Sequence, residues 1–291
     1  MAVRTRSRGA LPNLVVIGAM KCGTSSLHRY LDLHPEIQMS RPKELDFFLG
    51  GDGRSWGNWN RGVEWYAGHF SLDAPIRGES SVNYTNLPEA SRRTAERMHG
   101  VIPDAKLLYM VRDPIDRAVS HYLHARAAGR DEAPASQALA DPHGRFVRRS
   151  LYHAHLIEFL RFYPRERILV VAQEDLLDRR LETMRRIFRY LDVDEAFSSP
   201  QFERMWEVSR GKDRKFTLAF RATRRFGRRR WDRLPTNLRW LGERVVLLPV
   251  RGGLARPALE DALQEMLVER FRDDVERLRK LTGQEFATWS V

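Results

Sequence analysis

A short loop bounded by glycines holds the residues of this sequence best suited to binding a phosphate. Residues 18–26 read GAMKCGTSS and directly follow the apolar run Leu14 to Ile17. Glycines let a backbone fold tightly around a phosphate, and the N–H groups at the start of a following helix point at it. Lys21 adds an ammonium group inside the loop. The segment therefore predicts a site for a phosphorylated small molecule.

The position of the lysine separates this loop from the general nucleotide-binding loop, G-x-x-x-x-G-K-[ST]. Gly18 and Gly23 have its spacing and Ser25 takes its hydroxyl position, but Thr24 stands where that motif has lysine. A lysine at position 21 would lie beside the bridging oxygen of a terminal group instead of across β- and γ-phosphates. We find no clear acidic magnesium ligand at the end of an expected strand. A nucleotide kinase or other phosphate-loop NTPase is therefore the disfavoured alternative.

A second candidate phosphate site begins at Arg112. This residue ends an apolar run, and Ser120 lies eight positions later, two turns into a helix that Pro114 opens. A guanidinium presents a planar fork of donors that suits phosphate oxygens. The alternative is a local ion pair of Arg112 with Asp113, in which Asp113 caps the helix.

In this order the segments resemble the sulfotransferases that use 3′-phosphoadenosine 5′-phosphosulfate (PAPS), above all the heparan-sulfate-type branch and its bacterial relatives. Residues 21–27 are similar to the family's 5′-phosphosulfate loop, and residues 111–122 (VRDPIDRAVSHY) to its 3′-phosphate block R-D-P-x-x-R-x-x-S. Shorter similar segments are 33–35 (LHP), 42–48 (PKELDFF), 62–66 (GVEWY), 78–84 (GESSVNY), 271–278 (FRDDVERL), 281–283 (LTG) and Trp289. The resemblance covers most of the chain, and two phosphate signatures in the family's order make it specific.

The resemblance implies an enzyme that moves the sulfuryl group of PAPS in line to a hydroxyl or amine, without a metal, and releases adenosine 3′,5′-bisphosphate. Lys21 would stabilise charge on the departing oxygen, and Glu44 would be the general base. The implied cofactor-binding residues are Lys21, Gly23, Thr24, Ser25, Ser26, Arg112 and Ser120, with Lys212 and Arg214 in a looser match to a third loop.

Ordinary structural explanations exist for several of these residues. Glu44 beside Lys43 is otherwise a solvated ion pair, and the hydroxyls of residues 24–26 otherwise cap a helix. Lys212 and Arg214 otherwise belong to a solvated basic stretch. Arg117, inside the second phosphate signature, is expected to be structural.

Two positions near the expected acceptor depart from the heparan-type pattern. Asp46 stands where those enzymes often carry histidine, and Ser80 follows Glu79 where they often carry lysine. We therefore expect an acceptor other than a typical heparan chain. A carbohydrate, a glycolipid or another natural product all fit, and the choice between O- and N-sulfation stays open.

The apolar pattern predicts the elements that must position these residues. Continuous apolar runs, typical of strands buried on both faces, occur at 14–17, 105–111 and 167–172. Helical patterns occur at 24–33, 114–128, 176–191 and 258–281, the last before Gly283. Strands that alternate with helices predict an α/β, P-loop-like three-layer fold with a central parallel sheet flanked by helices. The cofactor should lie across the carboxyl ends of the strands.

Composition excludes some classes of protein and raises one alternative. The chain has 291 residues, 42% of them hydrophobic, which excludes a disordered chain. No apolar run approaches the roughly 18–20 residues of a membrane span. The net charge of +12 raises a nucleic-acid-binding protein as an alternative. No nucleic-acid motif accompanies it, so we expect no nucleic-acid partner.

Most of the excess charge is local. Residues 210–233 hold eleven lysines and arginines against two aspartates, about three quarters of the excess. We expect a mobile basic tail at 1–11 and a single domain over 12–291, with a basic helical segment at about 210–257 as a lid or cover. Within it, 216–248 interleaves arginines with aromatic residues, which also suits an anionic-acceptor platform or peripheral membrane contact.

Cys22 is the single cysteine, so the chain has no internal disulfide. It lacks the histidine partner of a nucleophilic cysteine, and we expect no chemical role for it. With no sustained apolar core near the N-terminal arginines, we expect no secretory signal and a cytoplasmic location. The sequence leaves the oligomeric state open.

Overall fold

The computed structural model describes residues 10–50, 57–128, 130–131, 133–204, 213–216, 248–253 and 255–291, with the backbone alone at 213–216 and 248–253. Most of the expected tail at 1–11 and most of the basic segment at 210–257 lie outside these residues. Ala10, however, is buried, and its N–H donates to Phe70 O at 3.4 Å. The packed part of the chain therefore starts earlier than residue 12.

A central sheet of parallel strands has the order β2-β3-β1-β4-β5. Its strands are β1 (Leu14–Gly18), β2 (Ile37–Met39), β3 (Ile76–Ser80), β4 (Lys106–Val111) and β5 (Ile168–Ala172). β1 is central, because Leu14 is in register with Gly78 of β3 on one side and with Lys106 of β4 on the other. Every residue of β1 is buried, as its continuous apolar run requires.

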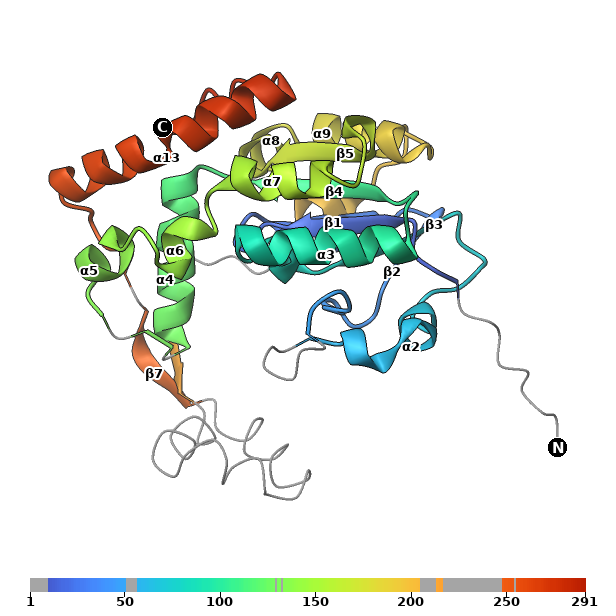
Figure 1. The fold of residues 1–291 in the computed structure, drawn as a ribbon, viewed down its shortest axis with the longest axis horizontal. Coiled ribbons are helices and arrows are strands. Elements are labelled where there is room, and N and C mark those ends of the chain that lie inside the picture. Colours follow the sequence, from blue (N-terminus) through green and yellow to red (C-terminus); the bar gives the residue numbers. More distant parts are fainter. Residues whose placement is uncertain are drawn as a thin grey trace.

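Helices flank this sheet, with α3 and α7 in front of it in the view of Figure 1. The longer helices are α1 (Thr24–Leu31), α3 (Pro88–Val101), α4 (Pro114–Ala127), α7 (Tyr152–Leu160), α9 (Arg180–Leu191) and α13 (Asp261–Thr282). The shorter ones are α2 (Val63–Ala67), α5 (Ala135–Ala140), α6 (Arg145–Arg148) and α8 (Gln173–Asp178), and the 3₁₀ turns are η1 (Trp59–Arg61), η2 (Val82–Thr85), η3 (Arg165–Arg167) and η4 (Pro200–Glu203). The predicted α/β fold with a central parallel sheet is confirmed.

The predicted elements differ from the observed ones in a few places. The helical pattern at 176–191 is two helices, α8 and α9, because the backbone leaves the helical region at Arg179 (φ −128°). The other predicted elements shift by three residues or fewer at their ends. Strands β2 and β3 and helices α2, α3, α5, α6 and α7 were not predicted. β3 reads IRGES, so it lacks the apolar pattern of a strand, and tertiary contacts bury its polar end.

The expectation of a helical segment at about 210–257 is wrong for its described residues, because 213–216 and 248–253 are strands and 255–257 have no regular structure. β6 (Asp213–Phe216) and β7 (Leu248–Gly253) form a two-stranded antiparallel sheet in which Phe216 is in register with Leu248. Pro249 lacks the N–H that a helix interior needs, whereas the edge of a two-stranded sheet tolerates it.

Candidate functional site

The segments that carry the predicted site residues leave the sheet at one edge. Strands β1 to β4 are parallel, so the segments that follow them start at the same edge. Ala19 N–H donates to Met110 O at 2.7 Å, which joins the loop after β1 to the end of β4. Asp46 N–H donates to Ser81 Oγ at 2.9 Å, which joins the segments after β2 and β3. Ligands of such sheets bind at this edge, where the strand order reverses.

The loop between β1 and α1 requires unusual backbone conformations. Gly23 has φ 83°, and Lys21 has φ 73°, in the left-handed region that lysine seldom adopts. At Gly18 (φ 150°) a Cβ would come within 2.0 Å of Thr85 Oγ1. A non-glycine residue in such a region costs about 1–3 kcal/mol and is typical of functional loops. The fold therefore holds Lys21 in one particular place.

The start of α1 is suited to an anion. Its N-cap residue is Gly23, no side chain caps it, and no acidic residue lies in its first turn. The first N–H groups of a helix lack partners within the helix and carry partial positive charge. Thr24, Ser25 and Ser26 lie within the first turn and not at the N-cap position, so the helix does not start at a capping hydroxyl. An oxyanion would complete the N-terminus.

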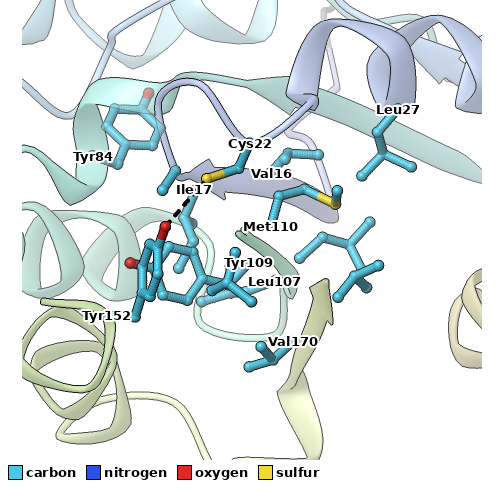
Figure 2. Packing of buried hydrophobic residues seen from close by; sticks show 14 of the residues in the cluster. Val16, Ile17, Cys22, Leu27, Tyr84, Leu107, Tyr109, Met110, Tyr152 and Val170 are labelled. Carbon is cyan, nitrogen blue, oxygen red and sulfur yellow. Dashed lines mark hydrogen bonds between the residues drawn. The ribbon is translucent and has the colours of Figure 1, made fainter. Parts of the chain in front are cut away.

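Cys22 is buried inside the loop and is unsuited to nucleophilic chemistry. Its Sγ lies 3.6 Å from the hydroxyl of Tyr152, among the apolar residues of β1 and β4 (Figure 2). Burial raises the pKa of the Cys22 thiol to about 11, so the thiol stays protonated. The Cys22 side chain is therefore part of the core that supports the loop between β1 and α1.

Arg112 stands where β4 ends and keeps about a fifth of its side chain exposed. Its Nη2 donates to Asp116 Oδ2 at 2.8 Å, one helical turn into α4, and Arg256 also pairs with Asp116. Asp113 caps α4 by accepting from Asp116 N–H at 2.9 Å, so the predicted cap exists, but the ion pair of Arg112 is with Asp116. Ser120 is buried on α4, two turns from this cap.

Arg117 has the structural role expected of it. The side chain is fully buried, its Nε donates to Ser150 Oγ at 2.6 Å, and its Nη2 donates to Phe146 O. Burial lowers the pKa of Arg117. These contacts attach α4 to the segment after α6.

Three carboxyl groups, those of Glu44, Asp46 and Glu79, lie near one another at this edge of the sheet. Glu44 accepts from Asn83 Nδ2 at 3.1 Å and pairs with Lys43 at 3.1 Å. The same Asn83 amide lies 3.4 Å from Asp46 Oδ1. Glu79 is fully buried. It accepts hydroxyl hydrogen bonds from Tyr66, Tyr84 and Ser81 at 2.8, 2.6 and 2.6 Å.

The environment of Asp46 makes its carboxyl group easy to protonate. Burial, followed by the charges of Glu44 and Glu79, raises the pKa of Asp46 to about 7. The backbone at Asp46 is left-handed (φ 46°). Glu44 therefore has a neighbour that gains or loses a proton near neutral pH.

The remaining residues singled out in the sequence either contact another element or lie, in whole or in part, outside what the structure describes. Ser80 is buried and its Oγ lies 2.9 Å from His28 Nδ1, so its side chain contacts α1. Lys212 is outside the described residues, and for Arg214 the structure gives only its backbone position in β6. The site of the third loop therefore stays a prediction.

Two residues of this region had no role in the sequence reasoning. Asn83 bridges two carboxyl groups, and Arg149 lies largely buried against Met20 of the loop. Asn83 lies within the motif 78–84, which could have drawn attention to it. Arg149 lies in a run of basic residues whose burial no sequence pattern indicates.

The described part of the chain shows no group of three histidine, cysteine, aspartate or glutamate residues placed to hold a metal ion. Among its helices, none combines the length and apolar character needed to cross a bilayer.

Comparison with known proteins gives consistent matches. Residues 12–199 match the model of the sulfotransferase family. The chain is 31% identical over 209 residues to mouse heparan sulfate glucosamine 3-O-sulfotransferase 6, an alignment covering 67% of this chain and 56% of that protein. It is 29% identical over 205 residues to bovine bifunctional heparan sulfate N-deacetylase/N-sulfotransferase 2, covering 63% of this chain and 22% of that protein. The crystal structure of a sulfotransferase from Alicyclobacillus acidocaldarius superposes with a TM-score of 0.67 at 26% identity, covering 97% of this chain and all of that one.

Proposed function

This chain belongs to the sulfotransferase family, and from that premise we propose that it transfers the sulfuryl group of PAPS to a hydroxyl or amine of a carbohydrate, glycolipid or other natural product. The observation that carries the proposal is the meeting of two kinds of group at one sheet edge. Residues after β1 and β4 supply cations, whereas the carboxyl groups come from Glu44 and Asp46 after β2 and from Glu79 near the end of β3. An anionic donor and an acceptor that must lose a proton need these two kinds of group side by side.

The cationic half fits a donor with two anionic ends. The uncapped start of α1 and the ammonium of Lys21 suit the 5′-phosphosulfate. Arg112 and Ser120, on the neighbouring turn, suit the 3′-phosphate. Lys212 and Arg214 stay predicted contacts, from the loose match of their segment to a third cofactor loop near the adenosine 3′-phosphate.

The transfer itself exchanges one bond to sulfur for another. The acceptor oxygen or nitrogen forms a bond to sulfur, and its proton passes to the carboxylate of Glu44. The bond from sulfur to the 5′-phosphate oxygen breaks, and adenosine 3′,5′-bisphosphate leaves with the electron pair. Lys21 stabilises the charge that develops on that oxygen more strongly in the transition state than in the ground state. Asn83 holds Glu44 by its Oε2.

The acceptor class follows from the carboxyl groups and the relatives together. The mammalian relatives are named for heparan sulfate, but the chain spans only about half of the mouse 3-O-sulfotransferase and a fifth of the bovine enzyme. Asp46 replaces the histidine that heparan-type enzymes often carry. The proposed acceptor is therefore a hydroxyl or amine of a carbohydrate other than a typical heparan chain, of a glycolipid or of another natural product.

Two measurements test this function. Calorimetric titration should show binding of adenosine 3′,5′-bisphosphate that magnesium–ATP does not displace. Incubation of the protein with ³⁵S-labelled PAPS and extracts of its native host should yield a labelled product, whose identity names the acceptor. Tight binding of magnesium–ATP without binding of the bisphosphate would reject the proposal in favour of an NTPase.

A further inference from the structure

Arg149 contacts the phosphate loop but belongs to a distant part of the chain. It follows α6, and its Nη1 lies 2.9 Å from the Sδ of Met20, the residue before Lys21. A thioether is a weak acceptor and leaves a guanidinium almost unsatisfied. The contact with Met20 therefore holds the guanidinium beside the loop without balancing its positive charge.

No group of opposite charge pairs with Arg149 in the part of the chain that the structure describes. Its Nε is inaccessible to solvent and has no hydrogen-bond partner. Its neighbours already have partners of their own, since Arg117 binds Ser150 and Arg145 pairs with Asp131 at 2.9 Å. Burial, and then the charges of Arg117, Arg145 and Arg130, lower the pKa of Arg149 to about 10.

Two nearby histidines carry no charge, so they neither add to this excess of positive charge nor balance it. Burial lowers the pKa of His155 to about 3 and that of His121 further, and Arg117 and Arg149 add to both shifts. Both rings are therefore neutral at physiological pH. The carboxylate whose charge acts on Arg149 is Glu44, which is bound to Lys43 and Asn83.

A buried cation among cations costs free energy unless a ligand completes it. A guanidinium fits the oxygens of a sulfuryl or phosphate group, with two parallel donors. Arg149 contacts Met20, which precedes Lys21, and the charge of Glu44 acts on its guanidinium. In the proposed function, the sulfuryl group lies between Lys21 and Glu44.

We propose that Arg149 is an oxyanion-binding residue of the donor site and that it binds the nonbridging oxygens of the sulfuryl group. This inference rests on the proposed function for the identity of the ligand. The anion-binding property of Arg149 does not rest on the proposed function, because it follows from the lack of an ion-pair partner for Arg149 among the described residues of this chain. Arg149 would act together with Lys21, one cation on the transferred group and one on the departing oxygen.

The test compares Arg149→Gln and Arg149→Lys with the control Arg148→Gln, whose guanidinium pairs with Glu89 on the surface. A charge-assisted hydrogen bond is worth about 1.5–3 kcal/mol, or roughly 10- to 150-fold in affinity. Calorimetry without acceptor should show the Kd for PAPS rising at least about 10-fold in Arg149→Gln and less in Arg149→Lys. The Kd for adenosine 3′,5′-bisphosphate, which lacks the sulfuryl group, should change by less than about 2-fold. An equal loss for both ligands would reject the sulfuryl assignment and make a phosphate the partner.

A second arm uses sulfate ion alone and needs no PAPS. Sulfate, compared with chloride at equal ionic strength, should raise the Tm of the wild type and of Arg148→Gln more than that of Arg149→Gln. Without sulfate, Arg149→Gln should unfold at the same Tm as the wild type or higher, because a repulsive charge is gone. If sulfate protects Arg149→Gln and the wild type equally and PAPS binds both equally, the inference is wrong. If the wild type binds neither PAPS nor the bisphosphate, the proposed function fails, and the sulfate comparison still decides the role of Arg149.

Discussion

Asparagine in place of Asp46 should stabilise the protein at alkaline pH. The carboxyl group of Asp46 lies beside Glu44 and Glu79, and its pKa is raised from 3.8 to about 7 by burial and by those charges. An acid with a raised pKa in the folded state binds protons more tightly there than in the unfolded state, so stability falls as the pH rises between the two values. Above pH 7 Asp46 is ionised in the folded state, and the full free-energy cost of burying its charge is present.

The size of the effect follows from the shift. A rise of about 3 pKa units corresponds to about 4 kcal/mol, at 1.36 kcal/mol per unit. The side chain is partly exposed, so solvent screening reduces this figure to about 2 kcal/mol. Asparagine tolerates the left-handed backbone at this position (φ 46°), and its carbonyl oxygen can still accept from Asn83.

Urea unfolding at pH 4.5 and pH 8.5 measures the effect. The stability gained by Asp46→Asn should grow by about 1–2 kcal/mol between the two pH values. Asp192→Asn is the matched control, because Asp192 is also left-handed (φ 64°) but exposed, and its effect should be the same at both pH values. A gain for Asp46→Asn that is absent, or equal at both pH values, would refute the reasoning.

Three further substitutions separate the roles of the site residues. Lys21→Ala should slow sulfuryl transfer at least about 100-fold while weakening bisphosphate binding far less, as measured by single-turnover kinetics and calorimetry; near-normal turnover would remove its catalytic role. Glu44→Gln should lower kcat by about 10²–10⁴ with little change in the Kd for PAPS, and a KM effect alone would show that Glu44 only binds the acceptor. Asp113→Ala should lower the free energy of unfolding by about 1–3 kcal/mol, since Asp113 caps α4 and accepts from Ser290 N–H and Oγ at 2.6 and 2.7 Å. Unchanged urea unfolding of Asp113→Ala would mean that neither contact stabilises the fold.

The two turns proposed to bind phosphate were predictable as turns because their signals are local. Gly18 and Gly23 mark a turn whose backbone conformation few other residues adopt, and the observed φ values are those a glycine allows. Asp113 and Pro114 mark the start of a helix through a cap and a fixed φ, and α4 begins at Pro114. Buried strands β1 and β4 carry continuous apolar runs because both of their faces are covered.

The carboxyl groups of the site were only half predictable. Glu44 was assigned from a resemblance, but nothing in the neighbouring sequence indicates that Asn83 would bridge it to Asp46. β3 holds glycine, arginine, glutamate and serine, so its pattern is not that of a buried strand. The buried carboxyl group of Glu79 accepts hydrogen bonds from the nearby Ser81 and Tyr84 and from Tyr66, which lies thirteen residues earlier in the chain.

The basic residues also divide into those whose role the sequence predicts and those whose role only the structure shows. From the sequence they form an excess of charge that first suggests nucleic acid, and most of it falls in 210–233, whose role stays a prediction, as does the cytoplasmic location. The structure shows that Arg117 is a buried structural residue and that Arg149 reaches the phosphate loop without a described counter-charge. The structural role of Arg117 was expected from the sequence, whereas the position of Arg149 does not follow from its residue type or spacing.

By itself the sequence determined the α/β fold, the positions of the two turns proposed to bind phosphate and the family, because turns, caps and buried strands depend on residues close together along the chain. Only the tertiary structure decided which charges meet. Met20 and Arg149 are 129 positions apart, and Glu44 and Asn83 are 39 apart, yet each pair is in contact. The field that acts on Asp46, Glu44 and Arg149 is a sum over such pairs, and it exists only once the strands have brought their ends to one edge.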